Sequence, residues 1–311
     1  MNLVLLAALP CLYWTAGVES AASLKAAGIE RLCVPPEQVG AWRNAGFSPS
    51  PLAEADLALR ETLPAPGIRA RADRASATRR PWIDANGWRF LRSPAGRYAY
   101  DLPAGTAGLG AAEAAVYGAD AVLKIDPADL QGLGQMLAFL SQLPANALPD
   151  VADLAVVDDG SAAMGEVLNL LVRRNLLFRI VKEPSPQFRI NVKLGTSEYL
   201  PKEAADPSAL ALKIRRQLTD EQRALRIFGS EVVIGRLTGE AGRVRLHLLN
   251  YGGREIEGLR IRLRGAYPDG VAQVAGRGRV NLEERVVADG ATEFSLPRMG
   301  AYGVVDLPAP K

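Results

Sequence analysis

The order of apolar and polar positions divides the chain into two parts. From residue 1 to about residue 225, continuous apolar runs alternate with segments of helical periodicity. Such alternation is typical of a parallel sheet covered by helices. From about Phe228 the runs are short, alternate with a period of two and are separated by Gly-rich turns, which indicates half-buried antiparallel strands. The pattern therefore predicts an α/β domain at 1–225 and an antiparallel β-sandwich domain at 226–311.

In the first part the apolar runs predict strands, and the periodic segments between them predict helices. The predicted strands are 3–9, 29–36, 97–103, 121–127, 152–160 and 176–181. The predicted helices are 18–27, 37–44, 108–117, 130–143, 164–175 and 207–218. In the second part, strands are predicted within 231–239, 243–252, 259–267, 271–276, 290–297 and 301–308.

The apolar N-terminus has two interpretations. Residues 1–17 are as apolar as a signal peptide, but no basic residue precedes the apolar run and Pro10 interrupts it. A helical segment follows directly at 18–27, which favours a buried first strand at 3–9. No run is long enough for a transmembrane helix. We therefore expect a soluble protein with no membrane partner, either cytoplasmic or exported by a leader outside this sequence.

Composition and charge exclude one class of partner. Apolar residues make up 48% of the 311 residues and charged residues 23%, which is enough apolar material for a large core. The net charge is +3, and the bases are interspersed with acids, so no nucleic-acid partner is predicted. Residues 69–80 are the exception, with five arginines. This stretch is predicted to be a solvated loop in preference to an anion or sugar site.

Cysteine and histidine are scarce. The two cysteines, Cys11 and Cys33, each lie near the end of an apolar run and are too few for a disulfide framework, so we expect buried thiols near neighbouring strand ends. The single histidine, His247, lies in a predicted strand of the second part. This placement argues against a Ser-His-Asp triad and against histidine-rich metal sites. The sequence predicts no metal and no cofactor.

Several acids follow predicted strands, where ligands of parallel α/β sheets bind. Cleavage of a glycosidic bond needs two carboxyl groups, one to protonate the leaving oxygen and one to attack or to activate water. The local sequence favours helix capping for Asp126 and for the pair Asp158 and Asp159. Asp101 follows a strand without an obvious helix partner, so it is a candidate acid. Glu113, in an alanine-rich predicted helix, is a second candidate.

The segment 81–90, PWIDANGWRF, is the richest binding candidate. Aromatic faces stack on the C–H surfaces of sugars, while carboxylates and amides bond to their hydroxyls. An alternative interpretation, given the same weight, is that the segment forms a turn and that its two tryptophans anchor the core. The predicted catalytic acids are thus Asp84, Asp101 and Glu113, and the predicted substrate-binding residues are Trp82, Asn86, Trp88, Arg89 and Trp14.

Three segments resemble parts of the TIM-barrel glycoside hydrolases with accessory domains, of which the family 42 β-galactosidases are an example. They are ADLAVVDDGSAAMGEVLNLLVRRNLLFRIV, the stretch from RLHLLNYGGREIEGLRIRLRGAY through EFSLPRMGAYGVVDLP, and AAEAAVYGADAV. The resemblance implies a barrel, then a flavodoxin-like unit at about 150–200, then a β-sandwich. It also implies a carbohydrate substrate or ligand.

The chain departs from that family in two respects. The part before Asp150 is shorter than the roughly 250 residues of an eight-stranded barrel, which implies a reduced or partial barrel. The strand-end Asn-Glu motif and the second strand-end glutamate are absent, so no catalytic residue carries over. The function expected first is that of a glycoside-hydrolase-like protein with a carboxylate acid/base mechanism. The alternative is a non-catalytic carbohydrate-binding or assembly protein derived from a glycosidase. The sequence does not decide whether the protein forms a homo-oligomer.

Overall fold

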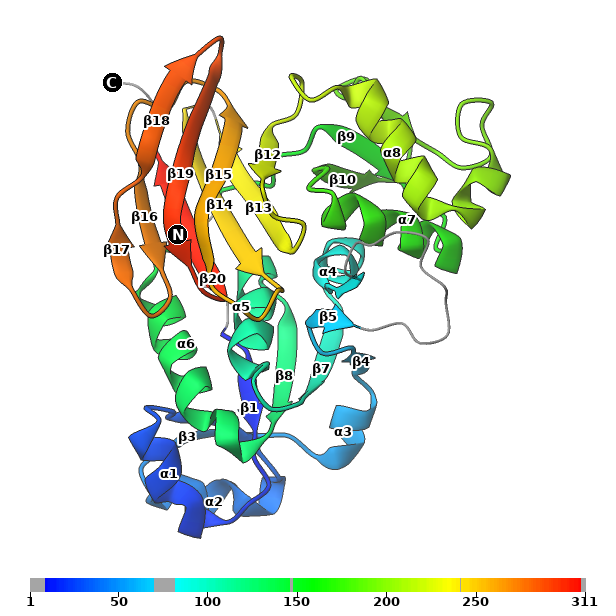
Figure 1. Cartoon of the computed structure of the whole chain (residues 1–311). Coiled ribbons are helices and arrows are strands. Elements are labelled where there is room, and N and C mark those ends of the chain that lie inside the picture. Colours follow the sequence, from blue (N-terminus) through cyan, green and yellow to red (C-terminus); the bar gives the residue numbers. More distant parts are fainter. Residues whose placement is uncertain (1–8, 70–81, 146–147, 241, 309–311) are drawn as a thin grey trace, which may run out of the picture. The chain divides into compact units, whose positions relative to one another are not determined.

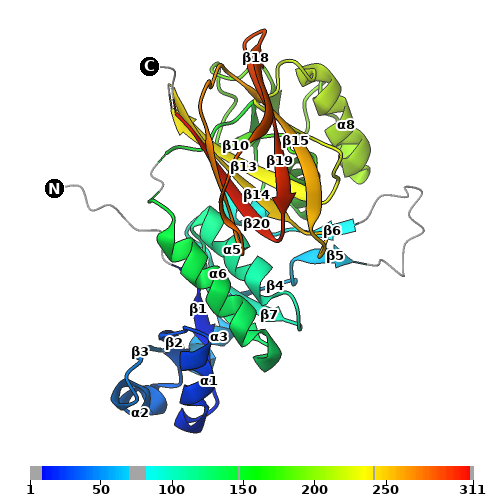
Figure 2. The same ribbon diagram turned by 60° about the vertical axis from the view of Figure 1, so that its left-hand side comes forward.

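The structure is a computed structural model that describes residues 9–69, 82–145, 148–240 and 242–308. Contacts divide the chain into two compact units. Unit 1 comprises Met1–Gly67 and Ser93–Ala147, and unit 2 comprises Ile68–Arg92 and Leu148–Lys311. Figures 1 and 2 label most of their helices and strands.

Unit 1 contains a parallel sheet of six strands, in the order β3-β2-β1-β8-β7-β4. The strands are β1 Cys11–Tyr13, β2 Arg31–Val34, β3 Ser48–Pro51, β4 Glu61–Leu63, β7 Arg97–Leu102 and β8 Asp120–Ile125. Strand β1 pairs with β8, the last of the six along the chain. Every pair of consecutive strands of this sheet is adjacent except β3 and β4, which is the order of a parallel barrel open at that point. The prediction of a reduced, partial-barrel parallel sheet is confirmed.

Helices follow most strands of unit 1. They are η1 Val18–Ser20, α1 Ala21–Ala26, η2 Pro36–Gln38, α2 Val39–Asn44, α3 Glu54–Ala58, α5 Ala107–Tyr117, η3 Pro127–Asp129 and α6 Leu130–Gln142. Helices α5 and α6 pack side by side, with α5 against β7 and β8 (Figures 1 and 2). A side chain at Gly134 of α6 would overlap the carbonyl oxygen of Ala27, so glycine is needed for this close approach.

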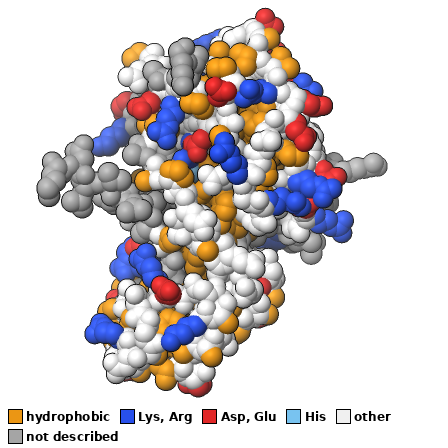
Figure 3. Space-filling model, turned by 90° about the vertical axis from the view of Figure 1, so that its left-hand side faces the viewer, with side chains coloured by type: hydrophobic (Ala, Val, Ile, Leu, Met, Phe, Trp, Pro, Cys, Tyr) orange, Lys and Arg blue, Asp and Glu red, His pale blue; other side chains and the backbone are white. Residues whose placement is uncertain are grey.

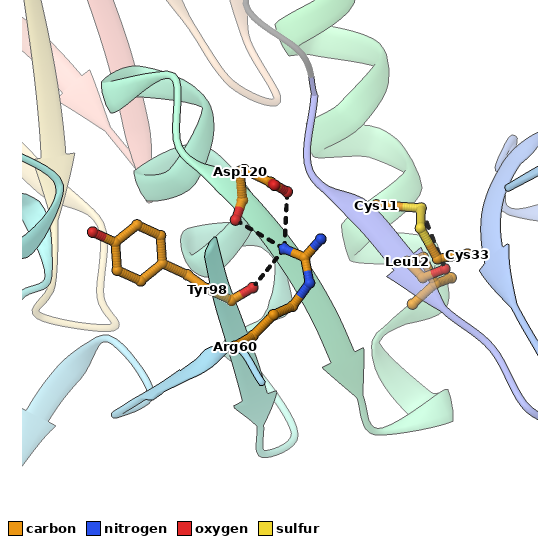
Figure 4. Close-up of a disulfide and its surroundings, with 6 residues drawn as sticks. All are labelled: Cys11, Leu12, Cys33, Arg60, Tyr98 and Asp120. Carbon is orange, nitrogen blue, oxygen red and sulfur yellow. Dashed lines mark hydrogen bonds and ion pairs between the residues drawn. A yellow bond between two sulfur atoms is a disulfide. The ribbon is translucent and has the colours of Figure 1, made fainter. Parts of the chain in front are cut away.

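The side chain of Arg60 ties the amino ends of two strands together. Arg60 Nη1 donates to the backbone oxygens of Tyr98 and Asp120 and, at 2.8 Å, to Asp120 Oδ1 (Figure 4). Only 8% of this side chain is exposed. Because this end of the sheet is opposite to the carboxyl ends, the tie stabilises the fold and does not form part of the candidate site.

The two cysteines correct a prediction. Cys11 and Cys33 form a disulfide between β1 and β2, with their Cα atoms 5.8 Å apart (Figure 4). The expectation of two buried thiols is therefore wrong, although the residues do lie on neighbouring strands. The sequence alone could not reveal the pairing, because it depends on the two strands being adjacent and in the right register.

Unit 2 contains a smaller parallel sheet. Its strands are β9 Leu154–Val157, β10 Phe178–Val181 and β11 Asn191–Val192, in the order β10-β9-β11. The helices of this part are α7 Ala162–Arg173, η4 Pro201–Ala205 and α8 Pro207–Leu218. The segment 68–92 adds the helix α4 Gly87–Arg92 and the strand β6 Trp82–Asp84, which pairs with β5 Gly67–Arg69, a strand that begins at the last residue of the first segment of unit 1. The parallel strands agree with a flavodoxin-like unit at about 150–200, which stays a prediction.

The rest of unit 2 is a β-sandwich, as predicted. One antiparallel sheet has the order β12-β15-β19-β18 and the other β13-β14-β20-β16-β17. Residues of both sheets form one apolar core, in which Leu246 on β14 and Ile261 on β15 are fully buried. The strands are β12 Leu225–Phe228, β13 Val233–Glu240, β14 Arg243–Asn250, β15 Ile256–Arg264, β16 Val271–Val274, β17 Gly278–Val280, β18 Glu283–Ala288, β19 Ala291–Met299 and β20 Tyr302–Leu307.

Two predictions, the first strand at 3–9 and the domain boundary at 225/226, are not tested by the structure. The strand at 3–9 lies, apart from Leu9, outside the described residues, and the first described strand is β1. In the described part of the chain all elements after α8 are strands, so the predicted change from mixed helices and strands to strands alone near residue 225 is confirmed. Contacts nevertheless group 148–225 with the sandwich in unit 2. A domain boundary at 225/226 therefore stays a prediction.

Candidate functional site

An open depression lies at the carboxyl ends of β7 and β8 in unit 1. Its volume is about 470 Å³, and it is lined by Asp101, Leu102, Pro103, Ile125 and Asp126. Parallel α/β sheets bind their ligands at this edge, because the loops and strand ends there are free to carry polar side chains. The depression is therefore the candidate site in unit 1.

Three polar side chains form a row across neighbouring strands at this edge. Asp101 on β7 is in register with Lys124 on β8. The ammonium of Lys124 lies 5.8 Å from the centre of the Tyr13 ring on β1. Residues in register on a sheet point to the same face. Tyr13, Lys124 and Asp101 thus form a polar layer next to the depression.

The Tyr13 side chain is mostly buried and lies near negative charge. Burial raises the pKa of Tyr13 above its usual value, and the charges of Glu54 and Glu37 raise it further. The phenol therefore stays protonated at neutral pH and can donate a hydrogen bond. Glu37 and Glu54 follow β2 and β3, so polar groups extend along this edge over several strands.

The two strand-end aspartates differ in their surroundings. Asp126 accepts a hydrogen bond from the amide of Ala128 at 2.9 Å and caps η3, so the prediction of capping is confirmed. Asp101 is exposed. Its carboxylate makes no hydrogen bond or ion pair with other residues in the part of the chain that the structure describes. Of these two aspartates, Asp101 is therefore the one more open to a ligand.

Glu113 has a different environment. It lies on α5, its side chain is fully buried, and it accepts a hydrogen bond from the hydroxyl of Tyr100 at 2.5 Å. Tyr100 is also fully buried. A carboxylate in this position supports the packing of α5 against β7 and is remote from solvent. Its predicted catalytic role stays untested, and Asp101 is the stronger candidate within unit 1.

Trp14 directly follows β1, at the carboxyl edge of the unit 1 sheet. It is 8% exposed, and its indole nitrogen donates to Ser20 Oγ at 2.8 Å. The hydroxyl of Ser20 donates in turn to the oxygen of Gly17. These bonds fix the loop after β1. The small exposed fraction leaves little of the indole for stacking on a sugar.

The other predicted residues lie in unit 2. Trp82 on β6 donates from its indole nitrogen to Asp84 Oδ1 at 3.2 Å, and Arg69 Nη1 lies 3.5 Å from Asp84 Oδ2. The guanidinium of Arg173 on α7 stacks over the Trp82 ring at 4.1 Å. One face of this indole is therefore already covered by protein.

Trp88 on α4 packs into the protein. It is 9% exposed, and the guanidinium of Arg89 lies over its ring at 4.4 Å. A side chain at Gly165 of α7 would lie 3.1 Å from Trp88 Cζ3, which shows how closely the two helices approach. Asn86, just before α4, is fully buried. This geometry favours the interpretation of core anchors over that of an open sugar platform.

The two aspartates after β9 accept hydrogen bonds from neighbouring residues of unit 2. Both oxygens of Asp158 accept hydrogen bonds of 2.8 Å from Arg92. Asp159 accepts from the amide of Ser161, and its hydrogen bond with the Ser161 side chain is the main reason that the pKa of Asp159 is lowered. The N-cap of α7 is Ser161, which accepts from the amide of Met164. The sequence thus located a cap in the right segment, but the prediction that an aspartate provides it is wrong.

The structure brings some candidates together and separates others. Asp101 shares its depression with Asp126 in unit 1, whereas Asp84 belongs to unit 2. The residues that sequence reasoning missed are Tyr13 and Lys124. Lys124 was detectable as the one polar interruption of the apolar run AVLKI, and Tyr13 as the last residue of β1 before the strand-end loop. Most of the basic stretch 69–80 lies outside the described residues.

The expectations about metals, membranes and charge concern the whole molecule. Among the described residues, no group of three or more His, Cys, Asp or Glu is placed to hold a metal ion. None of the described helices is long and apolar enough to cross a membrane. On the face shown in Figure 3, basic and acidic side chains are interspersed, as the sequence predicts.

Comparisons with known proteins support the fold. No family model matches the chain, and no curated protein matches it. The α-L-fucosidase isoenzyme 2 from Paenibacillus thiaminolyticus is similar in structure, with a TM-score of 0.54 and 9% identity over 94% of this chain and 80% of the fucosidase chain. A GH42 β-galactosidase from G. stearothermophilus gives a TM-score of 0.36 and 8% identity over 75% of this chain and 52% of its own. The similarity to the fucosidase, the one of these two with a TM-score above 0.5, shows that the chain has a glycosidase-like fold.

Proposed function

We propose that this protein binds carbohydrate at the carboxyl edge of the unit 1 sheet. The observation that carries the proposal is the exposed carboxylate of Asp101, which lines an open depression at that edge beside Lys124. A carboxylate accepts hydrogen bonds from sugar hydroxyls, and an ammonium donates to their oxygens. The depression, at about 470 Å³, lies within the range of small-molecule sites. The glycosidase-like fold supports a sugar ligand by analogy.

Hydrolysis is the second candidate. Asp101 and Asp126 line the same depression from neighbouring strands, and glycosidases need two carboxyl groups about 5 to 10 Å apart. Asp126 has a further oxygen beside the one that caps η3. We rank binding without hydrolysis first, because Asp126 is held in its cap and Glu113 is buried against Tyr100.

The segment 82–89 is a separate proposal for a sugar contact in unit 2. Trp82 and Asp84 are each partly exposed, and we propose that a sugar contacts the exposed part of this pair. The substitution Trp82→Ala tests it: loss of carbohydrate binding with an unchanged melting temperature would support the contact. A lower melting temperature with unchanged binding would assign Trp82 to the core.

The main experiment measures binding to a glycan array, followed by titration calorimetry with each glycan that binds. We expect Asp101→Asn to weaken binding by at least about tenfold, because a charged hydrogen bond contributes roughly 1.5–3 kcal/mol and about 1.4 kcal/mol is a factor of ten. Glu30→Gln is the matched control, since Glu30 is an exposed carboxylate at the opposite end of β2 and the variant should bind like the wild type. Equal binding by wild type and Asp101→Asn would overturn the site assignment.

Aryl glycosides and polysaccharides test the second candidate. Turnover that is lost in both Asp101→Asn and Asp126→Asn would establish hydrolysis at this depression. Binding without turnover would establish the first candidate alone. Turnover that survives both substitutions would place the reaction elsewhere on the chain.

A further inference from the structure

The disulfide lies in the middle of the unit 1 sheet. Cys11 is the first residue of β1 and Cys33 the third residue of β2, and these are neighbouring strands inside the sheet (Figure 4). Their Cα separation of 5.8 Å is in the ordinary range for a disulfide. The chain has two cysteines, so each is the other's only partner within the chain.

Strand β1 is short for its central position. It has three residues, and its register with β2 is given by the pairs Leu12↔Leu32 and Tyr13↔Cys33. So few ladder positions contribute few backbone hydrogen bonds. The covalent bond between Cys11 and Cys33 therefore adds to the ladders with β2 and β8 in holding this strand in register.

Tyr13 lies next to this link. It follows Cys11 by two residues, on the same side of β1, and is opposite Cys33 on β2. Tyr13, Cys11 and Cys33 belong to one apolar cluster. The amide of Trp14 donates to the oxygen of Cys33 at 2.9 Å. The disulfide is thus adjacent to the residues that end β1 at the edge of the candidate site.

We propose that the Cys11–Cys33 disulfide is a redox-sensitive tie that holds the β1 end of the sugar site, and that the protein works in an oxidising compartment. The effect on sugar binding rests on the function proposed above. Stable disulfides form and persist in oxidising compartments. Cys11 is half-buried and Cys33 is 9% exposed, so we expect a small dithiol to reach the bond from the Cys11 side.

The reduction is a two-electron exchange. A dithiol such as dithiothreitol attacks one sulfur as a thiolate, the Cys11–Cys33 bond breaks, and a mixed disulfide forms. The second thiol of the reagent then displaces the remaining cysteine and closes a cyclic disulfide. Both cysteines become thiols and the reagent is oxidised. Without the link, the β1 end that carries Tyr13 is held by backbone hydrogen bonds and packing alone.

The first experiment does not depend on a sugar. Alkylation followed by mass spectrometry counts the free thiols before and after dithiothreitol, and hydrogen exchange is measured on both forms. We expect no free thiol before reduction and both cysteines free after it, with faster exchange at 11–14 and unchanged exchange in the sandwich of unit 2. Two results would contradict the proposed role of the disulfide. One is free thiols in protein secreted into an oxidising medium, and the other is unchanged hydrogen exchange at 11–14 after full reduction.

The second experiment measures the binding of sugar by the oxidised and the reduced protein. We expect reduction to weaken binding at least about threefold, because the binding-competent fraction falls. The double variant Cys11→Ser with Cys33→Ser is the control, since dithiothreitol should not change its binding. Wild type that is reduced and then reoxidised is a second control that needs no variant to fold, and it should regain its binding. Unchanged binding after full reduction would overturn the link to the site. Absence of binding by the oxidised protein would instead count against the proposed function.

Discussion

Arg60 and Asp120 join the residue before β4 to the start of β8: the Arg60 Nη1 atom lies 2.8 Å from Asp120 Oδ1 and also bonds to the Asp120 backbone oxygen. The arginine side chain is 8% exposed, so its charge is largely removed from water and must be matched by these acceptors.

We expect Arg60→Met to lower the free energy of unfolding by about 2 kcal/mol, because three acceptors lose a charged donor. Arg97→Gln is the matched control. Arg97 lies 3.9 Å from the same carboxylate but is half exposed, so its loss should cost less than about 0.5 kcal/mol. Chemical denaturation of the variants checks both values. Equal effects for the two substitutions would contradict the assignment.

Helix α6 offers a paired test of packing. Gly134 faces the carbonyl oxygen of Ala27 so closely that a methyl group cannot fit, whereas Gly132 on the same helix faces open space. We expect Gly134→Ala to destabilise unit 1 by about 1–3 kcal/mol. Gly132→Ala should stabilise it by roughly 0.5–1 kcal/mol, since alanine is the better helix former. Melting temperatures of the two variants provide the measurement, and a shift in the same direction for both would refute this account of the packing.

The single histidine predicts that the free energy of unfolding depends on pH. His247 is buried and its Nδ1 lies 2.7 Å from the hydroxyl of Tyr302. Burial, followed by the charges of Arg236 and Arg245, lowers the pKa of His247 to about 3. The unfolded chain, with an ordinary pKa of about 6.5, therefore binds more protons than the folded chain between about pH 6.5 and 3. The contribution of His247 to stability is full above about pH 6.5 and falls as the pH decreases through that window.

Denaturation curves at several pH values from neutral down to the acid range test this expectation. The loss should approach about 1.4 kcal/mol per pH unit in the wild type and should be smaller in His247→Gln. The imidazole proton signals of the folded protein provide a second measurement, because one histidine gives one titration curve. An imidazole that titrates at its ordinary pKa in the folded state would contradict the prediction.

Local patterns allowed much of the fold to be predicted. The continuous apolar runs indicated strands of the parallel sheets, and the period of two after residue 225 indicated the sandwich, because each pattern reflects which faces of an element are buried. The cap at Asp126 was also predictable, since its bond joins residues two positions apart. Short strands such as β3, β4 and β11 were missed, because they have too few residues for a period.

The candidate site was only partly predictable. Asp101 could be chosen from its place after a strand, and Lys124 could be noticed as a polar interruption of an apolar run. Their adjacency could not be predicted, because it depends on the register of β7 against β8. The segment 82–92 showed the right residue types for sugar binding, yet its packing on α7 was hidden, because Gly165 and Trp88 are far apart in the sequence.

Element types, local caps and polar strand ends follow from the sequence alone, since each depends on neighbours within a few residues. The pairing of β1 with β8, the bond between Cys11 and Cys33, and the shared layer of Tyr13, Lys124 and Asp101 emerge only in the folded chain. These relationships join residues far apart along the chain. They are set by strand order and register, which arise from burial of the whole sheet and not from any single segment.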